Sequence, residues 1–400
     1  MRIAIPMLLL LASCATTQAE HSAGPAQAAV AFDAAGERGA WTAGIADPAT
    51  GRVVTPDDPV RIASVSKLIV AIGVMKLVEQ GKLELDRDVS AYVGWNARNP
   101  NFPRQVITLR KLLSHTSSLR DGDDAYVIPL GGSLEKALAD PGVWDEVHGP
   151  DDRYFAYSNF NFPVIASAME MVTGERFDIW MRREVLEPMK LDACFNWPTC
   201  SDDAVARAVV LTQDGKAVRD DLHGTRPDCP VVPATDGSCN LASWRPGDNG
   251  ALFSPQGGLR ISARGLARVG RMLLSGGTLD GVRILSPQSV ETMLSSAWRF
   301  EGANGSRDGE SDGICSYGLA TRQLATEPTA CGDDPEAKGS AWVGHAGDAY
   351  GLRSGIWIDR RRGIGIAYYV TGLPADPPHG KSSFTAAEEE AFRRAVGLLR

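Results

Sequence analysis

The stretch Ser64-Val65-Ser66-Lys67 opens an apolar run that continues to Gln80 and stops at Gly81. This pattern predicts a hydrophobic helix with a serine in its first turn and a lysine one turn later. Because residues three apart lie on the same face of a helix, we expect the Lys67 amine near the Ser64 hydroxyl. A serine hydroxyl is a poor nucleophile at neutral pH unless a neighbouring base takes its proton. The pair therefore indicates a candidate nucleophile and its base.

The rest of this helix is expected to be buried on most sides. Its apolar positions form one stripe that widens around the cylinder: Val65, Leu68, Ile69, Val70, Ile72, Val74, Met75, Leu77 and Val78. The first turn of a helix also carries unpaired N–H groups and a partial positive charge, which suit an oxyanion.

A second segment, Ser133-Leu134-Glu135-Lys136, has the same Ser-x-x-Lys spacing. It follows Gly131 and Gly132, so we expect Ser133 to be the N-cap of a short exposed helix with Lys136 in solvent. Short patterns of this kind often match by chance. Other parts of the chain must therefore distinguish Ser64 from Ser133.

The first residues predict export. Arg2 precedes an apolar stretch over 3–11, which is shorter than the about 20 residues that cross a bilayer, so residues 1–13 are expected to be a signal peptide. The sequence Leu11-Ala12-Ser13-Cys14 resembles a bacterial lipobox, in which cleavage precedes the cysteine and lipid is attached to Cys14. An ordinary secretory signal cut near Ala19 is the alternative. Residues 14–29 are predicted to be a tether, and the protein to be a lipoprotein anchored to a membrane and facing the periplasm.

The cysteines agree with an oxidising compartment. Seven are present, and without Cys14 six remain in three local couples. We predict the disulfides Cys194 to Cys200, Cys229 to Cys239 and Cys315 to Cys331. No Cys-x-x-Cys and no histidine pair with ligand spacing occurs, so neither a metal nor another cofactor is expected.

Composition excludes several classes of protein. The net charge of −8 is spread along the chain without a basic stripe, which argues against nucleic-acid binding. No P-loop, dinucleotide fingerprint or Gly-x-Ser-x-Gly elbow is present. With 44% hydrophobic residues in 400, the chain can bury a large core.

The coarse layout is rich in strands near both ends and helical between them. A hairpin is predicted over 39–46 and 52–54, and further strands near 317–324, 352–358 and 364–370. Helices are predicted at 109–113, 162–173, 179–186, 263–274, 287–294 and 385–399. This pattern predicts an α+β fold over 30–400, in which the terminal segments form an antiparallel sheet flanked by helices. A mainly helical lobe, at about 85–249, is inserted, and a cleft between lobes is a common place for a site.

Five segments carry a resemblance to a known family: 62–67 (IASVSK), 107–117 (ITLRKLLSHTS), 155–159 (FAYSN), 255–259 (PQGGL) and 344–347 (GHAG). In order and spacing they resemble the serine β-lactamase and penicillin-binding superfamily, nearest to the class C branch with its related DD-peptidases and esterases. The resemblance covers nearly the whole chain from residue 30 and implies a β-lactamase/transpeptidase-like fold.

The resemblance also assigns roles to residues. It makes Ser64 the nucleophile, Lys67 its proton acceptor, and Tyr157 and Asn159 the Tyr-x-Asn motif. A phenol beside a lysine is expected to have a lowered pKa and to shuttle protons. The Asn159 amide is expected to orient the Lys67 amine and to donate towards the substrate carbonyl. We expect His115 to pack or cap rather than catalyse.

The third motif departs from true class C β-lactamases, which have Lys-Thr-Gly where this chain has His345-Ala346-Gly347. A neutral histidine binds a substrate carboxylate poorly, and a satisfied core histidine is the alternative interpretation of His345. Gly347 lets a substrate approach the strand closely. The N–H groups of Ser64 and Asp348 are the expected oxyanion donors, with the Asp348 carboxylate pointing away.

Together these observations predict a serine hydrolase that acts through an acyl-enzyme on an ester, amide or peptide carbonyl. Its expected substrate is a small molecule or a cell-wall peptide. The alternatives are a D-Ala-D-Ala carboxypeptidase or class C-like β-lactamase, and a penicillin-binding sensor that is acylated without turnover.

Overall fold

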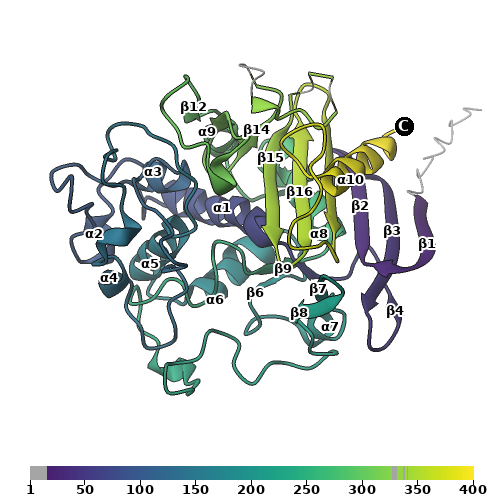
Figure 1. Ribbon diagram of the computed structural model, residues 1–400, viewed down its shortest axis with the longest axis horizontal. Coiled ribbons are helices and arrows are strands. Elements are labelled where there is room, and N and C mark those ends of the chain that lie inside the picture. The colour runs from purple at the N-terminus through teal and green to yellow at the C-terminus, as the bar shows by residue number, and fades with distance from the viewer. Residues whose placement is uncertain (1–15, 327–330, 337, 340) are drawn as a thin grey trace, which may run out of the picture.

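The computed structural model describes residues 16–326, 331–336, 338–339 and 341–400. Its main feature is a large sheet with the strand order β1-β3-β2-β17-β16-β15-β14-β13-β12, in which β4 pairs with β3 (Figure 1). The strands are β1 Thr16–Pro25, β2 Gln27–Asp33, β3 Glu37–Asp47, β4 Arg52–Val53, β12 Trp298–Arg299, β13 Ser316–Tyr317, β14 Arg322–Gln323, β15 Val343–Ala349, β16 Leu352–Asp359 and β17 Ile364–Val370. Neighbouring strands are antiparallel except β1 and β3.

Helices α8 (Ala263–Leu274) and α10 (Ala386–Gly397) cover opposite faces of this sheet. Ala28, Val30 and Phe32 of β2 face the core that contains α8. Ala29 and Ala31 face the other core, which contains α10. Strands buried on both faces lose the alternation of polar and apolar residues, and β2 is accordingly buried along almost its whole length.

The prediction of a tether over 14–29 is therefore wrong for the part of it that the structure describes. Residues 16–25 form β1, and β2 begins at Gln27. The small, mostly uncharged residues gave no periodic signal because β2 is covered from both sides. Cys14 and the predicted signal peptide lie outside the described residues.

The remaining helices lie mostly to one side of the sheet, and α1 lies between these helices and the sheet (Figure 1). Their bounds are α1 Ser66–Glu79, α2 Ser90–Val93, α3 Leu109–Leu113, α4 Leu134–Ala137, α5 Asn161–Thr173, α6 Phe177–Met181, α7 Asp202–Ala206 and α9 Pro287–Leu294; a π turn, Arg182–Leu186, follows α6. Small sheets join β5 (Val60–Arg61), β9 (Leu259–Ile261) and β6 (Cys194–Phe195), then β7 (Leu211–Gln213) with β8 (Lys216–Arg219), and β10 (Thr278–Leu279) with β11 (Val282–Arg283).

Most predicted elements occur where the sequence pattern placed them, including the β3–β4 hairpin, α5, α8, α9, β16, β17 and α10. The single strand predicted over 317–324 is wrong. Ala320 has a φ of 53°, and the Gly318 N–H donates to the Thr321 carbonyl at 2.7 Å, so a tight turn divides the segment into β13 and β14. The predicted mixed α+β fold is confirmed.

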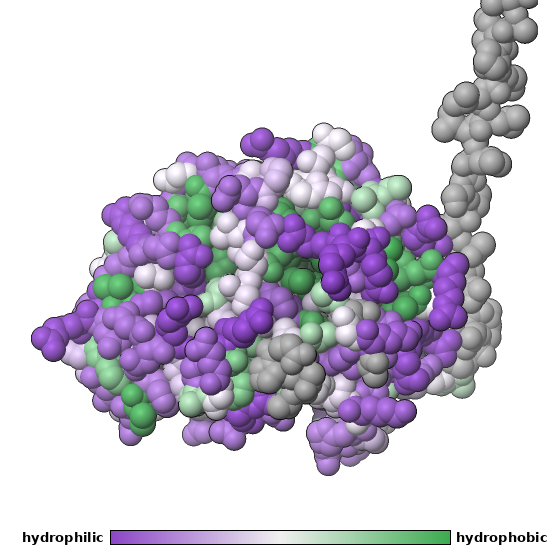
Figure 2. Space-filling view, turned by 90° about the horizontal axis from the view of Figure 1, so that it is seen from above, coloured by the Kyte–Doolittle hydropathy of each residue, from purple (hydrophilic) through white to green (hydrophobic). Residues whose placement is uncertain are grey.

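The six cysteines after Cys14 are paired as predicted, Cys194 with Cys200, Cys229 with Cys239, and Cys315 with Cys331. Among the described residues, no helix has the length and apolar character needed to cross a bilayer. Hydrophilic side chains cover much of the face seen from above, with apolar residues showing between them (Figure 2).

Candidate active site

Ser64 lies in a tight turn that leads into α1. Ala63 has a φ of 50°, and the 3-10 turn Ala63–Val65 precedes the first helical residue, Ser66. The Ser66 hydroxyl donates to the Ala63 carbonyl at 2.7 Å and accepts from the Leu259 N–H at 3.1 Å. These bonds fix the turn against β9, so the helix proper begins two residues later than the sequence predicts. Ser64 remains partly exposed at the mouth of a cleft.

Lys67 is fully buried, and its Nζ has three oxygen acceptors. It lies 2.8 Å from Ser64 Oγ, 2.7 Å from Asn159 Oδ1 and 2.9 Å from the Gln256 carbonyl. Burial lowers the pKa of Lys67 to about 8, although Glu310 and Asp121 oppose this shift by favouring the charged amine. A lysine with such a pKa can release and recover a proton near neutral pH at small free-energy cost.

Asn159 is held between Lys67 and a carboxylate. Its Oδ1 accepts from Lys67, while its Nδ2 donates to Asp121 Oδ2 at 2.9 Å. Asp121 takes one of the two N–H donors of this amide, and the donation towards a substrate carbonyl stays a prediction. Asp121 also accepts from the Ser158 hydroxyl at 2.8 Å and from the Phe160 N–H at 3.1 Å. No pattern in the sequence identified Asp121, because it lies in a loop without a motif.

Tyr157 lies beside Lys67, whose Nζ is 4.9 Å from the centre of the phenol ring. The phenol hydroxyl is buried; it faces the Ser64 hydroxyl without a well-formed hydrogen bond and has no other partner among the described residues. Burial, reinforced by Tyr317 and Glu310, raises the pKa of Tyr157 well above its usual value. The predicted lowering of this pKa is wrong: the desolvation of the phenolate outweighs the nearby lysine.

His115 stacks on Tyr157, with 4.1 Å between the ring centres. Its Nδ1 accepts from the Ser158 N–H at 3.0 Å, and burial lowers the pKa of the ring well below the usual value. His115 is thus a neutral residue that packs against Tyr157, as the sequence predicts.

His345 lies on β15 but does not offer a ring nitrogen to the cleft. Its Nε2 is 2.7 Å from the Tyr317 hydroxyl, and its Nδ1 faces the Ala346 carbonyl. Burial, reinforced by the charge on Lys67, lowers the pKa of His345 to about 3, so the ring is neutral. Both ring nitrogens of His345 have a partner within the protein, so neither is free to bind a substrate. This is the alternative interpretation of His345, a core histidine whose hydrogen bonds are all made internally.

Gly347 brings β15 against the turn that carries Ser64. The Ser354 hydroxyl on β16 donates to the Ile62 carbonyl at 2.8 Å. A Cβ atom on Gly347 would lie 3.3 Å from Ser64 N and would clash with the Ile62 carbonyl. The Asp348 carboxylate pairs with Arg353 on the neighbouring strand. The N–H groups of Ser64 and Asp348 remain the predicted oxyanion donors.

The other Ser-x-x-Lys segment forms no such site. The Ser133 hydroxyl accepts from the Lys136 N–H at 3.5 Å as the N-cap of α4, and the Lys136 side chain is exposed. This is the capping arrangement that the sequence predicts for Ser133.

The cleft beside Ser64 has a volume of about 750 Å³. Ser64 and Asn159 lie in its wall together with Glu310, whose carboxylate is 3.5 Å from Asn159 Nδ2. Arg61 and Arg219 lie in another part of the same wall. Sequence reasoning missed Glu310 and Arg219, since neither belongs to a motif and each reaches the cleft only through the folding of distant segments.

Comparisons with known proteins place the chain in a family. A sequence model of the Beta-lactamase family matches residues 17–389, so the chain belongs to that family. Penicillin-binding protein 4 of Amycolatopsis lactamdurans is 27% identical over 275 residues, which cover 68% of this chain and 66% of that protein. Protein flp of Staphylococcus aureus strain N315 is 27% identical over 140 residues, 34% of this chain and 28% of that one. The chain thus spans less than two thirds of these relatives.

Solved structures show the same fold. The octameric penicillin-binding protein homologue from Pyrococcus abyssi superposes with a TM-score of 0.65 at 19% identity, covering 94% of this chain and 73% of that one. The D-amino acid amidase of Ochrobactrum anthropi SV3 gives a TM-score of 0.64 at 18% identity, covering 94% of each chain. The predicted superfamily, serine β-lactamases and penicillin-binding proteins, is confirmed.

Proposed function

We propose that this protein is a serine hydrolase that forms an acyl-enzyme on Ser64 from an ester, amide or peptide substrate. The observation that carries the proposal is the 2.8 Å contact between Lys67 Nζ and Ser64 Oγ. Lys67 is buried, has a pKa of about 8 and forms no ion pair with a carboxylate of the described residues. An amine in this state can act as a base for the neighbouring hydroxyl.

The geometry supports a two-step mechanism. Ser64 Oγ attacks the substrate carbonyl as its proton passes to the Lys67 amine, and the oxyanion is held by the N–H groups of Ser64 and Asp348. Collapse of the tetrahedral intermediate breaks the bond to the leaving group, which takes a proton from Lys67 through the neutral hydroxyl of Tyr157. Water then attacks the ester carbonyl as one of its protons passes to the Lys67 amine. Collapse of the second tetrahedral intermediate breaks the bond to Ser64 Oγ, which takes this proton back from Lys67, and the acid is released.

Two alternatives from the same superfamily are a D-Ala-D-Ala carboxypeptidase or class C-like β-lactamase, and a sensor that is acylated without turnover. His345 bears on the first alternative. A buried neutral histidine bound to Tyr317 supplies no charge at the strand where Lys-Thr-Gly enzymes have a lysine. This favours a hydrolase that does not require a substrate carboxylate at that strand.

The test is intact mass during incubation with a penicillin, run beside turnover of p-nitrophenyl butyrate. We expect ester turnover that disappears in Ser64→Ala and persists in Ser133→Ala, the matched Ser-x-x-Lys control. A lasting penicillin adduct without turnover would instead identify a sensor. Full turnover by Ser64→Ala would overturn the proposal.

We also propose that the protein is exported and anchored by lipid on Cys14. Three disulfides in the described chain support an oxidising compartment. Fractionation of cells that express the full chain tests this: Cys14→Ser should move the protein from the membrane to the soluble periplasmic fraction. An unchanged membrane fraction would contradict the lipid anchor.

A further inference from the structure

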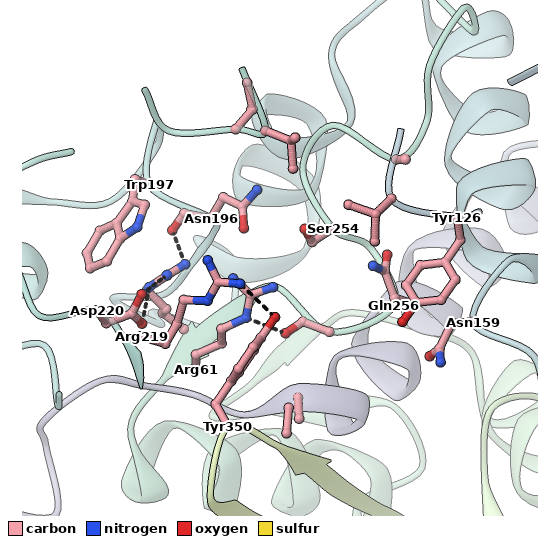
Figure 3. Close-up of a pocket in the computed structure, with 18 of the residues that line it drawn as sticks. Arg61, Tyr126, Asn159, Asn196, Trp197, Arg219, Asp220, Ser254, Gln256 and Tyr350 are labelled. Carbon is pink, nitrogen blue, oxygen red and sulfur yellow. Dashed lines mark hydrogen bonds and ion pairs between the residues drawn. The ribbon is translucent and has the colours of Figure 1, made fainter. Parts of the chain in front are cut away.

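Two arginines and a tyrosine form a positively charged group in the cleft, apart from the Lys67–Asn159 pair. Figure 3 shows Arg61, Arg219 and Tyr350 together, with Asn159 in another part of the same cleft. Arg219 donates to the Tyr350 hydroxyl at 3.0 Å, and its guanidinium carbon lies 4.5 Å from the centre of the phenol ring. The Arg61 guanidinium carbon lies 5.4 Å from the same centre.

The charges on these two arginines are not neutralised by the protein. Neither Arg61 nor Arg219 forms an ion pair with any carboxylate in the part of the chain that the structure describes. The carboxylate of Asp220 is taken by a third arginine: Arg260 Nε donates to it at 3.0 Å, and both side chains are buried. A cleft wall with two uncompensated guanidinium groups attracts an anion.

The positive charge of the two arginines affects the pKa values of Tyr350 and Arg260. Burial alone would raise the pKa of the Tyr350 phenol, but Arg61 and Arg219 lower it below its usual value. Burial lowers the pKa of Arg260 to about 10, and repulsion from Arg61 and Arg219 adds to this effect. The lowered pKa of Tyr350 has the sign expected of local positive charge, because burial acts in the opposite direction.

One loop, which contains Gln256 and Gly257, binds both Lys67 and Arg61. The Gln256 carbonyl accepts from Lys67 at 2.9 Å, and the next carbonyl, that of Gly257, accepts from Arg61 Nε at 3.1 Å. Successive Cα atoms are about 3.8 Å apart, so one peptide unit separates the anchor of Lys67 from that of Arg61. Ser64, Arg61 and Arg219 line the same cleft, so a substrate that acylates Ser64 shares this space with the two arginines.

The other part of the cleft is unsuited to an anion. Asp121 and Glu310 both approach Asn159 there, and His345 is neutral and buried. The leaving group must receive its proton from the Lys67 and Tyr157 side. The part of the substrate near the arginines is accordingly the acyl part.

We propose that Arg61, Arg219 and Tyr350 form a subsite that binds a carboxylate carried by the acyl part of the substrate. This inference rests on the proposed function and narrows it to hydrolysis of acidic acyl esters or amides. Arg219 supplies an exposed charge, and Arg61 is held by its bond to the Gly257 carbonyl.

The test compares mono-p-nitrophenyl adipate with its methyl ester, which has the same acyl chain without the charge. Two N–H donors to a carboxylate are expected to favour the acid over the methyl ester by about 10- to 100-fold in kcat/KM. Arg219→Gln should remove most of this preference by lowering kcat/KM for the acid more than for the methyl ester, whereas Arg219→Lys should retain part of it. Lys216→Gln, which removes an exposed charge from the same strand β8, is the matched control.

The outcomes separate the two proposals. Equal use of both esters, or a preference that survives Arg219→Gln, would overturn the subsite while leaving the hydrolase intact. An arginine-dependent preference for a carboxylate on the leaving phenol would overturn the acyl assignment. If neither ester is turned over, the proposed function fails, and calorimetry of monomethyl adipate with Ser64→Ala still tests the subsite: binding that Arg219→Gln weakens supports it, and no binding overturns it.

Discussion

The Tyr317 hydroxyl lies 2.7 Å from Nε2 of His345, and both side chains are buried. Because Nδ1 faces the Ala346 carbonyl, the ring donates from Nδ1 and accepts at Nε2, which keeps it neutral. Tyr317→Phe removes the donor and leaves Nε2 buried without a partner. We expect the free energy of unfolding to fall by about 1–3 kcal/mol, measured by urea denaturation. An unchanged unfolding midpoint would show that this contact is unimportant for the fold.

Tyr157→Phe is the matched change in the neighbouring ring. It should lower the activity and leave the stability nearly unchanged. The Tyr157 hydroxyl has no well-formed hydrogen bond in the described structure, so its removal should leave the unfolding midpoint nearly unchanged. Its loss as a proton relay should lower kcat by about 100-fold or more. Turnover of p-nitrophenyl butyrate measures this. Activity within a fewfold of the unaltered protein would remove Tyr157 from the mechanism.

The pH dependence of acylation should report Lys67. Only the neutral amine accepts a proton, so with a pKa of about 8, kcat/KM for a neutral ester should rise through pH 8 and level off above it. At pH 7 the rate should be about a tenth of the plateau. Glu310 favours the charged amine, so Glu310→Gln should move the rising limb to lower pH. A limb that Glu310→Gln leaves in place would contradict Lys67 as the base.

Gly347 should tolerate no side chain. A Cβ at this position would lie 2.4 Å from the Ile62 carbonyl oxygen and 2.4 Å from Ser354 Oγ, so Gly347→Ala must push β15 away from the Ser64 turn. A displacement of about 1 Å at a reacting group can cost about 100-fold in rate, and we expect a loss of that size in kcat/KM. Gly397→Ala, where a Cβ meets open space, is the control. Equal activity of the two variants would refute this role of Gly347.

The sequence predicts well what depends on local spacing. Ser64 and Lys67 are three residues apart on one helix, so their contact follows from helix geometry alone. Ser133 has the same spacing, but its two preceding glycines predicted the cap that the structure contains. The order of strands and helices was predictable for the same reason, wherever the apolar residues of a segment repeat with the spacing of a helix or a strand.

What could not be predicted depends on distant segments. Asp121 and Glu310 come from two separate segments and both favour the charged form of Lys67, and Asp121 also accepts a hydrogen bond from Asn159. No local pattern in the sequence marks either carboxylate. Strand β2 shows no alternation because helices from far along the chain cover both its faces. The pKa of Tyr157 has the wrong predicted sign because burial, which the motif does not reveal, outweighs the nearby lysine.

The buried ion pair behind the cleft gives a last prediction. Arg260 and Asp220 are 2% and 3% exposed at their side chains, and Arg260 also donates to the Asn196 carbonyl at 2.8 Å. Asp220→Asn removes the partner charge and leaves a buried guanidinium uncompensated, which is expected to lower the free energy of unfolding by about 3–5 kcal/mol. Asp203→Asn removes the carboxylate of an exposed pair with Arg207 and should cost less than about 1 kcal/mol. Urea denaturation of both variants measures the difference. Equal midpoints would mean that water reaches Arg260, and that the arginine wall of the cleft is more solvated than its burial indicates.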